Sequence, residues 1–283
     1  MPVVYLNGRF IPAEDAKVSV LDRGYLFGDG IYEVIPVYRA KAFMLEGHLA
    51  RLQRSLDAIK LANPLDNVYW ARLIADLIEQ NGGGDQSVYL QITRGAAAQR
   101  DHIFPQAVSP GIFMMSNPLK AVPADWHNQG INCITVDDIR WQRCDIKAIA
   151  LLANCLMKQQ AQEAGAQEAL LLRDGQLTEG AASNAYIVIN GEIITAPSGP
   201  QILSGITRDL VLALADEAGV KIQQRFASVD ELRAADEIWI SSSTKELVPV
   251  TMLDGKPVGN GQPGPIWQDL HQRFQQYKSE VLA

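Results

Sequence analysis

Apolar and polar residues recur with two different periods in the first half of the chain. Between His48 and Ile59 the large aliphatic residues recur every three or four positions, which predicts an amphipathic helix. Between Ser87 and Arg94 the pattern alternates at every second residue, which predicts a strand with one buried face. The run from Val3 to Phe10 predicts a hairpin that turns at Asn7-Gly8, because this pair favours a two-residue turn. Helices and strands therefore both contribute to this half.

The same two periods extend through the rest of the chain. Pro36 interrupts the apolar run from Ile31 to Tyr38 and cannot donate a ladder hydrogen bond, so this strand is expected at a sheet edge or with a bulge. Further strands are expected at 112–115, 132–139, 169–172, 185–189 and 238–244, and further helices at 69–80, 149–164, 204–218 and around Trp267 to Phe274.

Two prolines lie in the connector from Asn117 to Pro123, which favours a semi-rigid linker between domains. We therefore divide the chain into an N-terminal domain at 1–118, a linker at 119–123 and a C-terminal domain at 124–283. A length of 283 residues is sufficient for one large or two modest domains.

Composition narrows the class of protein. With 47% hydrophobic and 20% charged residues the chain is typical of a globular protein, and its net charge of -7 disfavours binding to nucleic acid. No apolar run approaches the roughly 18 residues of a membrane helix, and the start of the chain lacks a secretory signal pattern. Cys133, Cys144 and Cys155 form no CxxC pair, which favours a reduced, cytoplasmic location. No metal site is expected, because the histidines are scattered and no HExxH motif occurs.

The strongest chemical candidate is Lys147, in the mostly apolar stretch from Arg140 to Asn154. A lysine enclosed by apolar residues loses hydration, so its pKa should fall and leave a free amine at neutral pH. Such an amine is the nucleophile that a Schiff base requires. The alternative is a lysine that lays its stem on apolar surface and keeps its ammonium in water.

Two later stretches could hold a phosphate. The predicted helix that starts near Ser204 would present unpaired N–H groups and a positive dipole end. The alternative is that Ser204 simply caps this helix. The hydroxyl run from Ser241 to Thr244 follows a predicted strand and could also bind an oxyanion.

Three motifs together resemble the fold-type-IV pyridoxal-phosphate enzymes, which include the D-amino-acid and branched-chain aminotransferases. Arg143-Cys144-Asp145-Ile146-Lys147 is similar to the run that carries the cofactor lysine in the D-amino-acid branch. Leu177 to Asn184 is similar to the family's Thr-Glu-Gly signature, and Asp22 to Gly30 is similar to the glycine-rich entry into its first active-site strand. The likeness covers nearly the whole chain. It implies an α/β (α+β) two-domain fold, with a smaller N-terminal α/β domain and a larger C-terminal domain that has a mixed sheet or barrel core and flanking helices.

The resemblance also implies the site. Lys147 would hold pyridoxal 5'-phosphate as an aldimine and act as the catalytic base, and Glu179 would pair with the ring nitrogen. The cofactor-binding residues implied are Lys147, Glu179, Arg51, Ile206, Thr207, Ser243 and Leu203. The substrate-binding residues implied are Tyr32, Tyr89, Arg100 and His102. In the D-branch the Arg-x-His loop comes from the neighbouring subunit, which implies a homodimer.

Sequence differences favour one branch of this family. The L-specific branch has Tyr-Glu-Gly-x-Arg in its first strand, whereas this chain has Tyr32-Glu33-Val34-Ile35-Pro36. The deoxychorismate lyases usually have phenylalanine at the place of Tyr32. The implied reaction is therefore transamination of D-amino acids, with D-alanine and 2-oxoglutarate giving pyruvate and D-glutamate. The alternatives are an (R)-amine or branched-chain aminotransferase, a deoxychorismate lyase, and a non-catalytic pyridoxal-phosphate carrier.

Three departures from the D-branch pattern bear on the site. The loop from Arg94 to Arg100 is one residue longer, Ala181 and Ala182 replace frequent serines, and Pro36 replaces a residue that is usually not proline.

Overall fold

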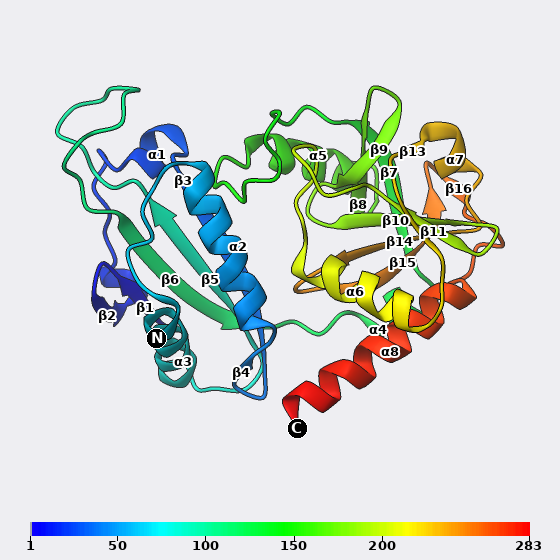
Figure 1. The fold of residues 1–283 in the computed structure, drawn as a ribbon, viewed down its shortest axis with the longest axis horizontal. Coiled ribbons are helices and arrows are strands. Elements are labelled where there is room, and N and C mark those ends of the chain that lie inside the picture. The colour runs from blue at the N-terminus through cyan, green and yellow to red at the C-terminus, as the bar shows by residue number, and fades with distance from the viewer. Residues whose placement is uncertain (1) are drawn as a thin grey trace. The chain divides into compact units, whose positions relative to one another are not determined.

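The computed structural model describes residues 2–283, and they fall into two compact units (Figure 1). Unit 1 contains the residues up to Lys120, together with Ile146–Ala150 and Leu282. Unit 2 contains Ala121–Asp145, Leu151–Val281 and Ala283. The short segment 146–150 is therefore part of unit 1, although the sequence alone assigned it to the C-terminal domain.

Unit 1 is a six-stranded antiparallel sheet with helices packed on it, in the strand order β2-β1-β6-β5-β3-β4. Its strands are β1 Val3–Leu6, β2 Arg9–Pro12, β3 Gly30–Tyr38, β4 Lys41–Ala42, β5 Gln86–Thr93 and β6 Gly111–Pro118. Its helices are the 3-10 turn η1 Ala13–Asp15, α1 Arg23–Phe27, α2 Leu45–Ala58 and α3 Asn67–Gln80. Buried aliphatic residues of β3 and β5 pack against α2 and α3 and form the core of this unit.

Unit 2 is built on a ten-stranded mixed sheet. The strand order is β12-β11-β10-β14-β15-β7-β8-β9-β13, with β16 paired to β15. Its strands are β7 Ile131–Asp137, β8 Glu168–Arg173, β9 Gln176–Gly180, β10 Asn184–Ile189, β11 Glu192–Thr195, β12 Ile222–Gln224, β13 Ala227–Ser228, β14 Glu237–Ser242, β15 Glu246–Leu253 and β16 Lys256–Pro257. Its helices are α4 Ala124–Asn128, α5 Leu152–Glu163, α6 Ile206–Glu217, α7 Val229–Arg233 and α8 Pro265–Leu282.

Several predicted elements are confirmed, because their patterns are local. The hairpin turns at Asn7-Gly8, where both residues have positive φ, and the amphipathic helix and the alternating strand are α2 and β5. Pro36 lies in β3, between β5 and the two-residue edge strand β4, and the pairing of β3 with β5 continues past Pro36 without a register shift, so the prediction of an edge strand or a bulge is wrong.

Two predicted helix starts are wrong. The helix expected over 149–164 begins at Leu152, because the residues before it pair with β3 instead. The helix expected from Ser204 begins at Ile206, and its N-cap is Gly205 without a side-chain capping bond. Ser204 is therefore not the cap of this helix.

Within residues 2–283, no helix is long and apolar enough to cross a membrane. Among the same residues there is also no cluster of three or more histidine, cysteine or acidic side chains that could hold a metal ion.

Candidate active site

The lysine segment forms an extra edge on the sheet of unit 1. Tyr32 N donates to Lys147 O at 2.9 Å, and Ile149 N donates to Gly30 O at 3.1 Å. The side chain of Ile146 is buried in the core of the unit. These contacts fix the backbone of Lys147 beside the start of β3, and they explain why no helix forms before Leu152.

The glycine-rich run before β3 makes room for this segment. Gly28 ends α1 with φ +66°, and a Cβ there would lie 3.1 Å from the Cβ of Ala150. A Cβ on Gly30 would lie 2.6 Å from Ile92 O. Both positions therefore favour glycine, one through its positive φ and the other through close backbone approach.

The side chain of Lys147 is half-buried and lies over an aromatic ring. Its Nζ is 4.2 Å from the centroid of the Tyr32 ring, a cation–π distance when the amine is protonated. Tyr32 stacks on Tyr89 with ring centroids 5.7 Å apart. Burial raises the pKa of Tyr89 to about 12, and its hydroxyl donates to Gln91 at 2.7 Å. The structure thus groups Lys147 with two of the predicted substrate-binding residues.

A buried ion pair lies in the same unit. The Nε and Nη2 atoms of Arg51 each donate to Glu33 at 2.8 Å, and His48 Nδ1 is 2.8 Å from the same carboxylate. All three residues are at most 4% exposed. Burial alone would raise the pKa of Glu33, but the charge and hydrogen bonds of Arg51 lower it to about 2. Burial lowers the pKa of His48, and the charge of Lys147 adds to this effect. Arg51, predicted to bind phosphate, is therefore oriented by an ionised glutamate.

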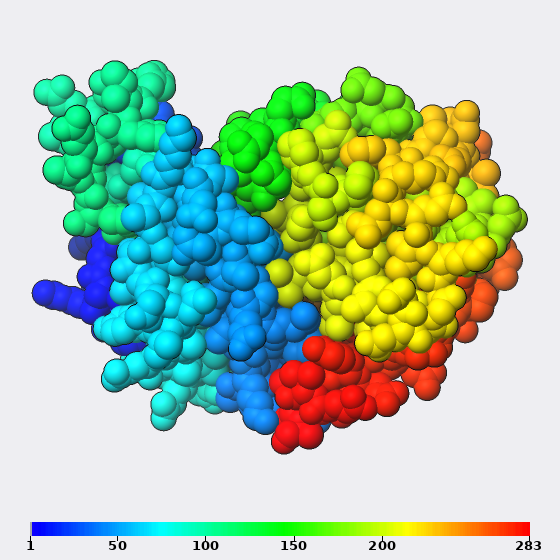
Figure 2. All heavy atoms as spheres, viewed as in Figure 1, coloured from blue at the N-terminus to red at the C-terminus, as the bar shows by residue number. Residues whose placement is uncertain are grey.

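The remaining predicted substrate residues lie on the long loop between β5 and β6. Figure 1 shows this loop extending beyond the sheet of unit 1, and Figure 2 shows its blue-green atoms at the surface. Arg100 and His102 are exposed, and both lie against Phe27. The structure therefore places this pair around Phe27 and groups Tyr32 with Lys147.

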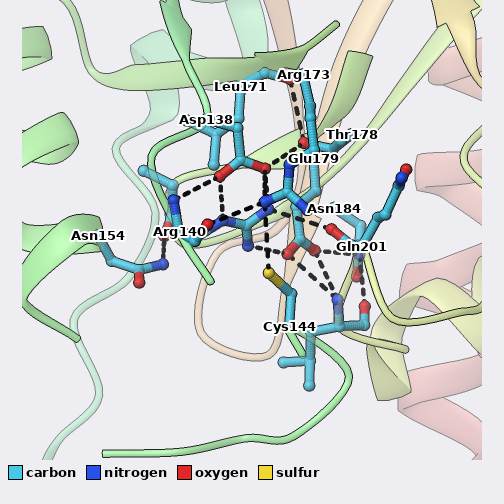
Figure 3. A network of polar contacts seen from close by, with 12 residues as sticks. Asp138, Arg140, Cys144, Asn154, Leu171, Arg173, Thr178, Glu179, Asn184 and Gln201 are labelled. Atoms are coloured by element: carbon cyan, nitrogen blue, oxygen red, sulfur yellow. Dashed lines mark hydrogen bonds and ion pairs between the residues drawn. The ribbon is translucent and has the colours of Figure 1, made fainter. Parts of the chain in front are cut away.

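In unit 2, Glu179 is the centre of a buried polar network (Figure 3). Its carboxylate accepts from Leu203 N at 3.2 and 3.1 Å, from Asn184 Nδ2 at 3.1 Å, and from Arg140 Nη1. Asn184 also donates to Leu203 O at 2.8 Å. A Cβ on Gly205 would lie 2.1 Å from the Asn184 amide oxygen, so this position requires glycine. Three segments of unit 2 thus fix one carboxylate.

Arg140 is shared between two carboxylates. Its Nε and Nη2 donate to Asp138 at 2.8 Å each, while Nη1 reaches Glu179. Asp138 also pairs with Arg173 at 3.0 Å and accepts from Thr178 at 3.1 Å. Figure 3 shows Asp138 on one side of the Arg140 guanidinium and Glu179 on the other.

The environment of Glu179 has an electrostatic consequence. Burial raises the pKa of Glu179 to about 7, although Arg140 and Leu203 N oppose the shift. The nearby charge of Asp138 raises it further. A carboxyl group with this pKa is close to half-protonated at neutral pH, so it can share a proton with a basic ring nitrogen.

The predicted phosphate-binding residues other than Arg51 are in unit 2. Ile206 and Thr207 form the first turn of α6, where no side chain makes a capping bond. Helix N-termini of this kind bind anions through backbone N–H groups. Ser243 follows β14 and is half-buried. Leu203, also predicted, uses its backbone N–H to bind Glu179.

Sequence reasoning assigned no role to Glu33, His48, Asp138 or Arg140. A signal for Glu33 exists, because it occupies a position of β3 between buried Ile31 and Ile35, where a charge requires a partner. No local signal identifies Arg140, since its partner Glu179 is 39 residues away.

Comparison with known proteins identifies the family. The model of the class IV amino-transferases matches residues 30–253. The branched-chain amino acid aminotransferase of Escherichia coli superimposes with a TM-score of 0.90 at 27% identity, covering 97% of this chain and 93% of that one. The branched-chain aminotransferase of Thermoproteus uzoniensis, solved with norvaline, gives a TM-score of 0.86 at 26% identity with the same coverage. The chain belongs to the class IV aminotransferases, and the predicted fold class is confirmed.

Curated sequences indicate a particular branch. The D-alanine aminotransferase of Bacillus licheniformis is 40% identical over 272 residues, which are 96% of this chain and 95% of that protein. The D-alanine aminotransferase of Staphylococcus aureus (strain MW2) is 41% identical over 278 residues, 98% of each. The protein is therefore an aminotransferase with full-length similarity to D-alanine aminotransferases.

Proposed function

We propose that this enzyme transfers the amino group of D-amino acids, with D-alanine and 2-oxoglutarate giving pyruvate and D-glutamate. The observation that supports this choice most directly is the identity of about 40% to D-alanine aminotransferases over nearly the whole chain. The sequence of the first strand also supports D-amino acids as substrates, because it lacks the glycine and arginine of the L-specific pattern.

The cofactor in this proposal is pyridoxal 5'-phosphate. The chemistry of the donor set fits it: an amine at Lys147, a buried carboxyl group at Glu179 whose pKa is raised to about 7, and a helix N-terminus at Ile206 without a side-chain cap. When bound, this cofactor supplies an electron-withdrawing ring that stabilises negative charge at the substrate Cα.

The residues of this chain then have separate tasks. Lys147 holds the cofactor through Nζ and, when released, moves the proton of the substrate Cα. Glu179 holds a proton at the ring nitrogen, and Arg140, Asn184 and Leu203 N fix its carboxylate. Arg51, Ile206, Thr207 and Ser243 bind the phosphate, with Glu33 holding the Arg51 guanidinium in one orientation.

Substrate recognition falls to Tyr32, Tyr89, Arg100 and His102. An arginine fork can meet both oxygens of an α-carboxylate, which fixes the substrate orientation and so the enantiomer. Arg100→Ala should therefore weaken D-alanine and 2-oxoglutarate together, by about 30- to 1000-fold in kcat/KM.

A homodimer is part of this proposal. Large hydrophobic side chains are exposed on unit 1 in the segments 18–25 and 103–104, which supports a covered surface. They are Val18, Val20, Tyr25, Ile103 and Phe104, with 63%, 70%, 76%, 76% and 48% exposure. In sedimentation experiments the parent should be a dimer, and a Tyr25→Asp variant should shift toward the monomer. A parent that sediments as a monomer contradicts the dimer.

A cytoplasmic location is likewise proposed, on the argument of reduced thiols. Cys133, Cys144 and Cys155 are all unpaired in the described part of the chain.

The alternative activity is that of the branched-chain aminotransferases, because the two solved structures described above carry that name. Assaying D-alanine, L-leucine and (R)-1-phenylethylamine against one 2-oxo acid separates the candidates. Preference for D-alanine supports the proposal, whereas preference for L-leucine or for the amine overturns it.

The lysine assignment has its own experiment. Borohydride reduction followed by peptide mapping should find the pyridoxyl group on Lys147, and Lys147→Ala should abolish both label and activity. Lys158→Ala and Lys245→Ala are matched controls, since both lysines pair with the buried Glu168. A label on either of them contradicts the role of Lys147.

A further inference from the structure

Arg23 is a buried arginine for which the reaction described above has no use. It begins α1, directly after Asp22, and is 3% exposed. Its Nε donates to Asp29 at 2.7 Å, which accounts for its charge but leaves both terminal nitrogens for other partners.

Those terminal nitrogens hold three consecutive carbonyls of the loop between β5 and β6. Nη1 donates to Asp101 O at 2.5 Å and lies 3.4 Å from Ile103 O, while Nη2 donates to His102 O at 3.3 Å. The guanidinium also lies 4.8 Å from the centroid of the Phe27 ring.

Phe27 extends this support to the side chains of the loop. The Arg100 guanidinium carbon is 4.8 Å from its ring centroid, and the His102 ring is 5.2 Å away. Arg23 therefore fixes the backbone of the segment 101–103, and Phe27 packs against the two side chains assigned to the substrate carboxylate.

A second arginine provides an internal comparison. Arg94 Nε donates to the same Asp29 oxygen at 2.8 Å, and Arg94 is 5% exposed. Its Nη2 donates instead to Ile59 O at 2.7 Å, at the end of α2. Arg94 contacts the loop by stacking on Phe104, at 3.6 Å. Both arginines are thus buried and pair with Asp29, but Arg23 donates to the backbone at 101–103, whereas Arg94 donates to the backbone at the end of α2.

We propose that Arg23 is a positioning residue for carboxylate recognition: it holds the backbone of the Arg100–His102 loop so that these side chains meet the α-carboxylate. This inference rests on the proposed function. A lysine at this place could keep the ion pair with Asp29, but a single ammonium cannot reproduce the planar fork that spans three carbonyls.

The experiment compares holoenzymes carrying Arg23→Lys and Arg94→Lys. Arg23→Lys should raise KM for D-alanine and 2-oxoglutarate by about tenfold, a loss equal to one weak polar contact, and change kcat by less than about threefold. Hydrogen exchange of the backbone amides at 101–103 should become at least about tenfold faster in the same variant. Arg94→Lys should change neither quantity, although both variants lose similar thermal stability.

The outcomes separate the two proposals. Unchanged KM and unchanged exchange in Arg23→Lys, or equal changes in Arg94→Lys, overturn the role of Arg23 in an enzyme that prefers D-alanine. A parent enzyme that does not act on D-amino acids overturns the proposed function, and with it the substrate role of the loop.

Discussion

Glu33 in unit 1 and Glu179 in unit 2 are both buried glutamates paired with a buried arginine, yet their pKa values are shifted in opposite directions. The pKa of Glu33 is lowered to about 2, and that of Glu179 is raised to about 7. Their burial is nearly the same, 0% and 4% exposed, so burial does not explain the difference.

The arginine partners explain it. Arg51 directs two nitrogens at Glu33, and His48 adds a third contact to the same carboxylate. Arg140 directs two of its nitrogens at Asp138 and only one at Glu179. Because Arg140 is shared with Asp138, and the charge of Asp138 itself raises the pKa of Glu179, the opposing effect of Arg140 does not overcome the burial of Glu179.

The comparison separates a carboxylate that orients a neighbouring side chain from one that is suited to proton transfer. With a pKa lowered to about 2, Glu33 stays ionised at neutral pH, which suits a residue that orients Arg51. Glu179 has a pKa raised to about 7, which suits its proposed role of sharing a proton with a ring nitrogen.

The largest expected difference is in stability. Glu33→Ala leaves the buried Arg51 without its carboxylate, so the free energy of unfolding should fall by about 3–5 kcal/mol. Glu179→Ala leaves Arg140 paired with Asp138, so the loss should be only about 1–3 kcal/mol. Urea unfolding of the cofactor-free variants, followed by circular dichroism, measures both. Equal losses would mean that Asp138 does not balance Arg140.

The effect on kcat should have the opposite order, with the larger loss in the Glu179 variant. Glu179→Gln removes the negative charge that keeps a ring-nitrogen proton in place, so kcat should fall by about 10²–10³-fold while the cofactor stays bound. Glu33→Gln should leave kcat within about tenfold but release the cofactor on dialysis, because Arg51 loses its orientation. The absorbance of bound cofactor and single-turnover rates distinguish the two effects. A Glu179→Gln enzyme with parental kcat would contradict the ring-nitrogen assignment.

Much of the fold was predictable from sequence, because it depends on local patterns, whereas Glu179 was singled out by a motif that resembles the family's. The hairpin at Asn7-Gly8 and the amphipathic α2 follow from spacing over about a dozen residues or fewer. The predicted family is confirmed by its family model and its full-length relatives. The roles of Lys147 and Glu179 remain predictions that the experiments above test.

The rest depends on contacts between distant segments. The helix start at Ile149 was wrong because residues 146–150 pair with β3, more than a hundred residues earlier. The pairing of Arg140 with Glu179 depends on the neighbouring strands β7, β8 and β9, which no local pattern specifies. Arg23 donates to backbone carbonyls nearly eighty residues away. Every residue has a backbone carbonyl, so the sequence does not indicate which one accepts.

The pH dependence of the free energy of unfolding should reflect the opposite pKa shifts of the two glutamates. The pKa of folded Glu179 is raised from 4.5 to about 7, so the folded protein binds more protons in this window. Its contribution to stability is present below about pH 4.5 and is lost as the pH rises to about 7, a change of about 3 kcal/mol. Glu33 behaves oppositely, and its contribution is lost as the pH falls from 4.5 toward about 2.

Other groups, including His48, also titrate in this range, so the measured quantity is the difference between parent and variant. The cofactor-free Glu179→Gln protein should lack the decline between about pH 4.5 and 7 that the parent shows. Parallel curves for parent and variant would show that Glu179 titrates normally.

The smallest expected effect tests the explanation itself. Asp138→Asn removes the charge that raises the pKa of Glu179 and leaves more of the Arg140 charge for Glu179. The pKa of Glu179 should therefore fall toward its ordinary value, and each unit of that change removes about 1.4 kcal/mol from the pH-dependent part of stability. Carbon-13 NMR of the glutamate carboxyl groups measures the shift. Asp137→Asn is the matched control, because it changes the same charge on the neighbouring, exposed residue. A larger shift with Asp137→Asn than with Asp138→Asn would show that net charge, and not competition for Arg140, sets the pKa of Glu179.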